Sequence, residues 1–199
     1  VNALSVSIKG VVNKYFTDNI GKFGKSFRRS NVLSLVDDVS PAVLSSRAEV
    51  KVQQRITPTV NAINSFNLTY PTAILDPTDS IEPVVTSTNF VVNGATCRIE
   101  NRTARTLSDD KVVPASNILR IVEIGTGAIK TNNIGSFDPI SGKLDIVAFK
   151  PTALSGGDGI IKISVTPANQ SAITPELNEI LNFDEIASTI TPVIVDAQN

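Results

Sequence analysis

The chain has 199 residues, with 18 Lys and Arg against 19 Asp and Glu, one Cys, and no His, Met or Trp. The absence of His excludes a histidine general base and His-ligated zinc, and a single Cys excludes an internal disulfide or a cysteine metal cluster. The net charge of −1 gives no electrostatic basis for binding nucleic acid.

These counts lead us to expect no catalytic residue, no cofactor, no metal and no small-molecule substrate. No apolar run approaches the roughly 18 residues that a membrane span needs, so no membrane partner is expected either. A hydrophobic share of 41% is typical of a globular protein. Because the chain begins with Val1 and lacks Met, we expect a processed product or a fragment of a longer protein.

Residues 1–46 are predicted to form a helical N-terminal unit. Apolar residues recur at three- and four-residue spacing on one face of the first helix: Leu4, Ile8, Val11, Val12, Tyr15 and Phe16. Gly21 is expected to end this helix. Ser30 is the predicted N-cap of a second short helix, and Ser40-Pro41 has the cap and first-turn residues of a further one.

Residues 47–170 are predicted to form a β-rich body. From Arg47 the apolar period changes to two, which predicts a strand over 47–56 with one buried and one charged face. Further strands are expected at 66–70, 84–92, 96–101, 118–124, 144–149 and 160–165. Asn93-Gly94 predicts a tight hairpin turn, and Pro139 with Gly142 predicts another reversal of the chain.

Residues 171–199 are predicted to form a C-terminal helix and extension. Thr174, Pro175 and Glu176 are typical of a helix start, and Leu177, Ile180 and Leu181 follow on one side. The apolar stretch 190–195 is either an edge strand or an extension onto a neighbour. The expected fold class is therefore α+β and mainly β, with a helical N-terminal unit, a body of antiparallel or mixed sheets, and a short C-terminal helix.

Several chemical motifs fail on spacing. Residues 125–131 resemble part of a phosphate-binding loop but have Ile129 where a glycine must precede the lysine. The acidic residues of 76–82 and the glycines of 155–159 lack the spacing of calcium loops. These segments are predicted to be turns. Cys97 is predicted to be a small buried apolar residue.

The basic segment 22–30 is the most unusual local feature, because it combines four positive charges with two phenylalanines. In one interpretation, Arg28 and Arg29 bind carboxylates of a partner and the phenylalanines are apolar anchors. In the other, the segment is an inter-helix loop whose phenylalanines reach the core while the charges stay in water. Both interpretations remain open at this stage.

Four stretches together resemble the C-terminal part of the T4-type bacteriophage baseplate wedge protein family, gene product 6. They are residues 24–30, residues 40–46, the alternating strand 47–56, and the segment 134–146. The resemblance implies a structural virion protein of the contractile-tail baseplate, assembled in the host cytoplasm. It also implies two kinds of partner: another copy of the chain, and other wedge proteins that it joins into a ring around the tail tube.

The resulting hypothesis is a self-association module without enzymatic activity. The contact is assigned to the apolar face of the first helix together with Lys25, Phe27, Arg28 and Arg29. The alternative is a carbohydrate-binding or adhesin-type β module of a surface or secreted protein, although an aromatic share of 5% offers few rings for a sugar platform. An enzyme ranks third, because it needs a carboxylate pair that the sequence does not locate.

Overall fold

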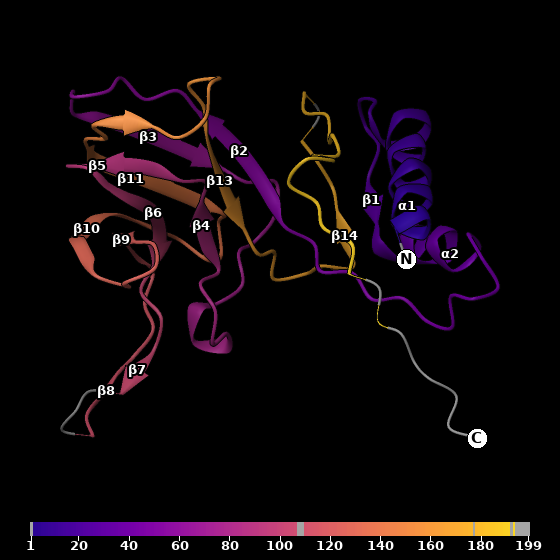
Figure 1. Ribbon diagram of the computed structural model, residues 1–199, viewed down its shortest axis with the longest axis horizontal. Helices are drawn as coiled ribbons and strands as arrows, with labels where there is room; N and C mark the ends of the chain where they lie inside the picture. Colours follow the sequence, from indigo (N-terminus) through magenta and orange to yellow (C-terminus); the bar gives the residue numbers. More distant parts are fainter. Residues whose placement is uncertain (1, 107–109, 177, 192, 194–199) are drawn as a thin grey trace. The chain divides into compact units, whose positions relative to one another are not determined.

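The computed structural model describes residues 2–106, 110–176, 178–191 and 193. The chain divides into two units (Figure 1): unit 1 is formed by Val1–Glu49 and Ser171–Asn199, and unit 2 by Val50–Gln170. The predicted fold class is confirmed, since an N-terminal helix precedes a β-rich body of antiparallel sheets. Among the described residues, no helix is both long and apolar enough to cross a membrane.

Unit 1 begins with helix α1 (Asn2–Tyr15), which continues into one π-helical turn, η1 (Phe16–Ile20). The chain leaves the helix at Gly21, as predicted, and the Gly21 N–H donates a 2.6 Å hydrogen bond to the carbonyl oxygen of Phe16. Strand β1 (Phe27–Arg28) and helix α2 (Arg29–Asp37) follow.

The C-terminal segment belongs to the same unit because β14 (Ala172–Ile173) pairs with β1 in antiparallel register, with Phe27 opposite Ile173. Figure 1 shows β14 beside β1. The Phe16 ring stacks on both Phe27 and Phe183, with centroid distances of 5.7 and 5.4 Å. The buried apolar side chains of the unit are Ile8, Val12, Ile20, Phe27, Val32 and Ile173.

Three predicted helix features of unit 1 are wrong. The N-cap of α2 is Arg28, not Ser30, and it makes no side-chain capping bond. Ser40-Pro41 forms a single turn, in which the Ser40 carbonyl accepts a hydrogen bond from the Val43 N–H and no helix follows. The predicted C-terminal helix is absent from residues 174–176 and 178–191.

The segment follows β14, which pairs with β1, and it contains isolated turns, with the Glu179 N–H donating to the Glu176 carbonyl and the Ser188 N–H to the Asp184 carbonyl, while its Phe183 ring packs on Phe16. So short a helix would not be stable by itself, because isolated helices below about 12 residues are marginal in water. Leu177 lies outside the described residues, as do 192, 194 and 195 of the predicted stretch 190–195; residues 190, 191 and 193 form no strand.

Unit 2 is built on one antiparallel sheet with the strand order β2-β13-β4-β6-β9-β10-β11-β3, from which β5 pairs with β6 and β12 with β5. Its strands are β2 (Val52–Ile56), β3 (Asn64–Thr69), β4 (Val85–Ser87), β5 (Phe90–Val92), β6 (Ala95–Asn101), β9 (Ile118–Glu123), β10 (Ile129–Phe137), β11 (Lys143–Phe149), β12 (Ala153–Leu154) and β13 (Ile161–Val165). A separate hairpin joins β7 (Arg105–Thr106) to β8 (Val112–Val113), and a 3₁₀ turn, η2, covers Pro77–Asp79.

The sheet curls back on itself, because its two end strands approach each other. The Gln54 side chain in β2 donates a hydrogen bond to the Thr69 carbonyl at the end of β3. The buried Tyr70 hydroxyl donates to the Ile163 carbonyl of β13 at 2.8 Å. The enclosed face holds the core, including Ile99, Leu119, Ile134, Leu144, Ile146, Ile161, Ile163 and the edge-to-face pair Phe90–Phe149.

Most predicted strands are present, but two boundaries differ. The stretch 84–92 contains two strands, β4 and β5, and β2 begins at Val52 rather than at Arg47. The alternating pattern therefore crosses the boundary between the two units at Glu49 and Val50. The hairpin turn is confirmed, since Asn93 and Gly94 both have positive φ, 49° and 80°, between paired β5 and β6.

Candidate functional site

The predicted contact face of α1 packs largely inside unit 1. Ile8 and Val12 are each 8% exposed, and the remaining members are half-buried: Leu4, Val11, Tyr15 and Phe16. The outward face of α1 instead carries Ala3, Val6, Ser7 and Gly10, and Val6 is 68% exposed. The periodic apolar face therefore forms the core of the unit.

The structure separates the two phenylalanines of the basic segment. Phe27 is a core residue with 7% exposure, whereas Phe23 is 64% exposed. Lys25 and Arg28 lie on the surface, and half-buried Arg29 donates a hydrogen bond to the Ala48 carbonyl at 3.4 Å. The core interpretation is therefore correct for Phe27 and not for Phe23, and the partner-binding interpretation stays a prediction.

Helix α2 carries its charges in the unfavourable order for its dipole. Arg28 and Arg29 occupy its N-cap and first position, and Asp37 and Asp38 occupy its last position and C-cap. A helix N-terminus has partial positive charge and favours anions, while the C-terminus favours cations. Within the described part of the chain, Arg28, Asp37 and Asp38 make no ion pair. We did not predict this arrangement, although the Arg-Arg and Asp-Asp dipeptides at the helix ends are visible in the sequence.

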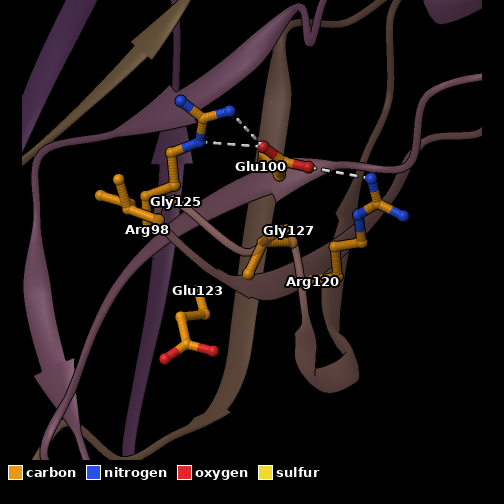
Figure 2. Close-up of a pocket in the computed structure, with 8 residues that line it drawn as sticks. Arg98, Glu100, Arg120, Glu123, Gly125 and Gly127 are labelled. Carbon is orange, nitrogen blue, oxygen red and sulfur yellow. Dashed lines mark hydrogen bonds and ion pairs between the residues drawn. The ribbon is translucent and has the colours of Figure 1, made fainter.

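Unit 2 contains a buried charge cluster on the sheet face opposite the core. Glu100 on β6 lies directly opposite Arg120 on β9, and Arg98 lies two residues before Glu100 on the same face. One Glu100 oxygen accepts a hydrogen bond from Arg120 Nη2 at 2.8 Å, and the other accepts one from Arg98 Nε at 2.9 Å (Figure 2). The Glu100 and Arg120 side chains are only 5% and 9% exposed, whereas that of Arg98 is 42% exposed.

The β9–β10 loop borders a hollow of about 260 Å³ beside this cluster, and four charged residues line it, Arg98, Glu100, Arg120 and Glu123, together with Val122, Ile124, Gly125 and Gly127. The Glu123 carboxylate at the loop's start points away from Glu100 in Figure 2. It accepts a hydrogen bond from Thr126 and pairs with Lys130 at 3.2 Å. These two contacts lower the pKa of the Glu123 carboxyl.

One donor of the cluster has no partner. Arg120 Nε is buried and makes no hydrogen bond. A buried polar group without a partner is costly, so such atoms call for an explanation. This cluster was not predicted, because alternation places Arg98 and Glu100 on the outward face of a strand, where charged residues are ordinarily in water.

The other segments that were considered for chemistry are turns, as predicted. Residues 124–128 connect β9 to β10, and the Asp76 side chain caps η2 by accepting from the Thr78 N–H at 2.8 Å. Cys97 is fully buried in the core, as expected. Within the described ranges, no group of three or more His, Cys, Asp or Glu is placed to hold a metal ion.

Residues 2–55 match the family described as baseplate structural protein gp6, C-terminal domain III. This match confirms the resemblance to a C-terminal portion of the T4-type gene product 6 family. It indicates a structural role for the matched segment in a phage baseplate, together with other baseplate proteins. The location that the family implies is the tail baseplate of the virion. No curated protein matches the chain.

Proposed function

We propose that this chain self-associates through unit 1 and links neighbouring wedges into a ring around the tail tube, in a baseplate that assembles in the host cytoplasm. The observation that supports self-association is the inverted charge order of α2. Two antiparallel copies of this helix, related by a two-fold axis, would place Arg28 of one chain beside Asp37 and Asp38 of the other. Such a pairing is self-complementary, as a two-fold contact requires.

The exposed residues of α2 fit this contact. Ser30, Asn31, Ser34, Asp37 and Asp38 are exposed and recur at three- and four-residue spacing, so they share one face. None of the uncharged side chains on this face is bulky, and a second helix can approach closely. The partner's aspartates would lie at the N-terminus of α2 and its arginine at the C-terminus, which is the favourable order for both dipoles.

Further contact area must come from outside α2. A nine-residue helix is only about 13 Å long, whereas a stable interface buries on the order of 800 Å² per partner. Unit 1 exposes Val6 and Phe23, with 68% and 64% of their surfaces accessible. Buried aromatic side chains contribute strongly to interfaces, so Phe23 replaces Phe27 as the expected apolar anchor.

A charge-swap series tests the contact by light scattering over a range of protein concentrations. Arg28→Glu should shift the chain toward monomer, and so should the double variant Asp37→Arg, Asp38→Arg. The triple variant should restore association, because each helix end again meets the opposite charge. Arg47→Glu is the matched control, since Arg47 is an exposed arginine of the same unit and its side chain is 88% exposed.

Folding and association are separable in this series. Arg28→Glu should stabilise the isolated helix by about 0.3–1 kcal/mol, because it places a negative charge at the N-terminus of α2. Loss of association with unchanged or higher thermal stability therefore identifies a lost contact rather than an unfolded unit. A parent chain that stays monomeric at every concentration would overturn self-association by this chain, and an unaffected R28E variant would overturn the α2 contact.

The structure offers little to the carbohydrate-binding alternative. All ten aromatic residues lie in the described ranges, and Phe23 is the one that is exposed. A sugar platform needs several exposed rings on one face. We therefore do not propose this function.

A further inference from the structure

The structure assigns a second binding site to unit 2: we propose that the hollow above Arg98, Glu100 and Arg120 binds the carboxylate of an acidic side chain on a partner protein. This site lies on the β6–β9 face and is separate from the residues of α2 invoked for self-association. It depends on a structural role in an assembly, but not on the chain pairing with itself.

The first argument is charge. Two guanidinium groups flank one carboxylate, so the cluster carries a net charge of +1. The buried pair Glu100–Arg120 is balanced, and the excess positive charge lies on Arg98, whose side chain is 42% exposed and can pair with a further anion. The nearby Glu123 does not supply the missing negative charge, because its carboxylate is bound by Thr126 and Lys130 and points away.

The second argument is the supply of hydrogen-bond donors. A guanidinium group has five N–H donors, and Arg120 uses only Nη2, while its buried Nε has no partner. Arg98 uses Nε and Nη2, both on Glu100. Since Arg98 is 42% exposed, the cluster is open to solvent on its side. A carboxylate entering there meets the Arg98 guanidinium, which Glu100 already holds in position.

The third argument is space. The hollow of about 260 Å³ is bordered by Gly125 and Gly127, and a Cβ atom on either glycine would meet nothing within 4 Å. The space next to each glycine is therefore unoccupied by other atoms of the chain, and a ligand can approach the backbone of the loop there.

The charge of the cluster also favours a carboxylate over a phosphate group. A single carboxylate balances the net charge of +1, whereas a phosphate group carries about −1.5 to −2 at pH 7 and would overcompensate it. The chain as a whole has a net charge of −1 and offers no basic surroundings for a polyanion.

The test uses the ¹⁵N-labelled chain and three probes at constant ionic strength: N-acetyl-glutamate α-amide, N-acetyl-glutamine α-amide and inorganic phosphate. We expect the glutamate probe to give weak, saturable shifts at the amides of Gly125 and Gly127 and at the Nε–H signals of Arg98 and Arg120. The glutamine probe, which lacks the charge, should give none.

Two variants make the test specific. Arg98→Gln leaves the Arg120–Glu100 pair intact. It should lower the affinity for the glutamate probe roughly tenfold or more, because a charge-assisted hydrogen bond is lost. Arg55→Gln removes an exposed arginine of the same unit and should change nothing. Absence of saturable shifts, equal shifts with the glutamine probe, equal binding to R98Q, or tighter binding of phosphate would each overturn the proposal. Because unit 1 keeps all its residues, none of these outcomes depends on self-association.

Discussion

Glu100 and Arg120 face each other across the β6–β9 ladder, and the Glu100 carboxylate lies 2.8 Å from Arg120 Nη2 in a nearly water-free position. The pair is therefore both a link between two central strands and part of the proposed carboxylate site. Removing one partner from a buried pair leaves the other charge uncompensated.

Glu100→Gln should accordingly destabilise the chain by about 3 kcal/mol, because two guanidinium groups then remain without their anion. Urea unfolding measures this loss. Glu123→Gln is the matched control, since its pair with Lys130 is more exposed, at 24% and 36%, and should cost under about 1 kcal/mol. Equal losses in the two variants would show that burial does not strengthen the Glu100 interactions.

The hydrogen bonds to the Asp138 carboxylate lead us to expect that the stability of the chain depends on pH in the acid range. Hydrogen bonds from the Ser141 hydroxyl and from the Ile140 N–H hold the pKa of its carboxyl below the ordinary value of 3.8. A depressed folded-state pKa contributes stability that is present above pH 3.8 and is lost as the pH falls through the folded-state value.

Asp138→Asn should therefore flatten the decline of unfolding free energy between pH 5 and pH 2, measured by urea unfolding at each pH. Ser141→Ala removes the largest cause of the shift and should give an intermediate slope. An unchanged slope in D138N would show that other carboxylates dominate the acid side of the profile.

The elements that sequence analysis predicted well are those with local signals. Alternating apolar residues predicted β3 and β6, and short apolar runs predicted β9, β11 and β13. Asn93-Gly94 located its hairpin because both residues tolerate positive φ. The pairing of β1 with β14 had no such signal. It involves two residues on each side, separated by most of the chain, and leaves no periodicity to detect.

The candidate sites were not predictable from the sequence, because they too depend on contacts between residues that are far apart in the chain. Whether the apolar face of α1 packs inside its unit or against a partner depends on Phe183 and β14, which are remote in the sequence. Arg98 and Glu100 have the alternation of a solvated face, and a loop that follows the next strand of the sheet borders the hollow beside them. In both cases a distant segment determines burial.

Two glycines give opposite predictions on substitution with alanine. At Gly135 the backbone has φ of 139°, and a Cβ atom would lie 2.0 Å from the Asp145 carbonyl oxygen on β11. Gly135→Ala should destabilise unit 2 by about 2–3 kcal/mol, since backbone strain and a clash combine.

At Gly10, in the middle of α1, a Cβ atom would meet nothing within 4 Å. Gly10→Ala should therefore stabilise α1 by about 0.8–1 kcal/mol, the difference in helix propensity. Chemical unfolding of both variants, followed separately by hydrogen exchange of the helix and sheet amides, measures the two effects. Destabilisation of the isolated chain by G10A would mean that the outward face of α1 is covered within unit 1.

Phe27 and Phe23 form a second matched pair, four residues apart in the basic segment. Phe27 packs on Phe16 in the core of unit 1, so Phe27→Ala should cost about 3–5 kcal/mol and increase hydrogen exchange throughout that unit. Phe23 is 64% exposed, and Phe23→Ala should change stability by less than about 0.5 kcal/mol.

Light scattering of these two variants then tests which phenylalanine is needed for association rather than for folding. A stable F23A chain that associates more weakly than the parent would identify Phe23 as the anchor of the self-association proposed for unit 1. Unchanged association in F23A would show that Phe23 is not part of that interface. The charged residues at the ends of α2 would then be the remaining candidates for the contact. Association of F27A cannot decide this point, because loss of the Phe16–Phe27 stack disturbs the unit that carries both features.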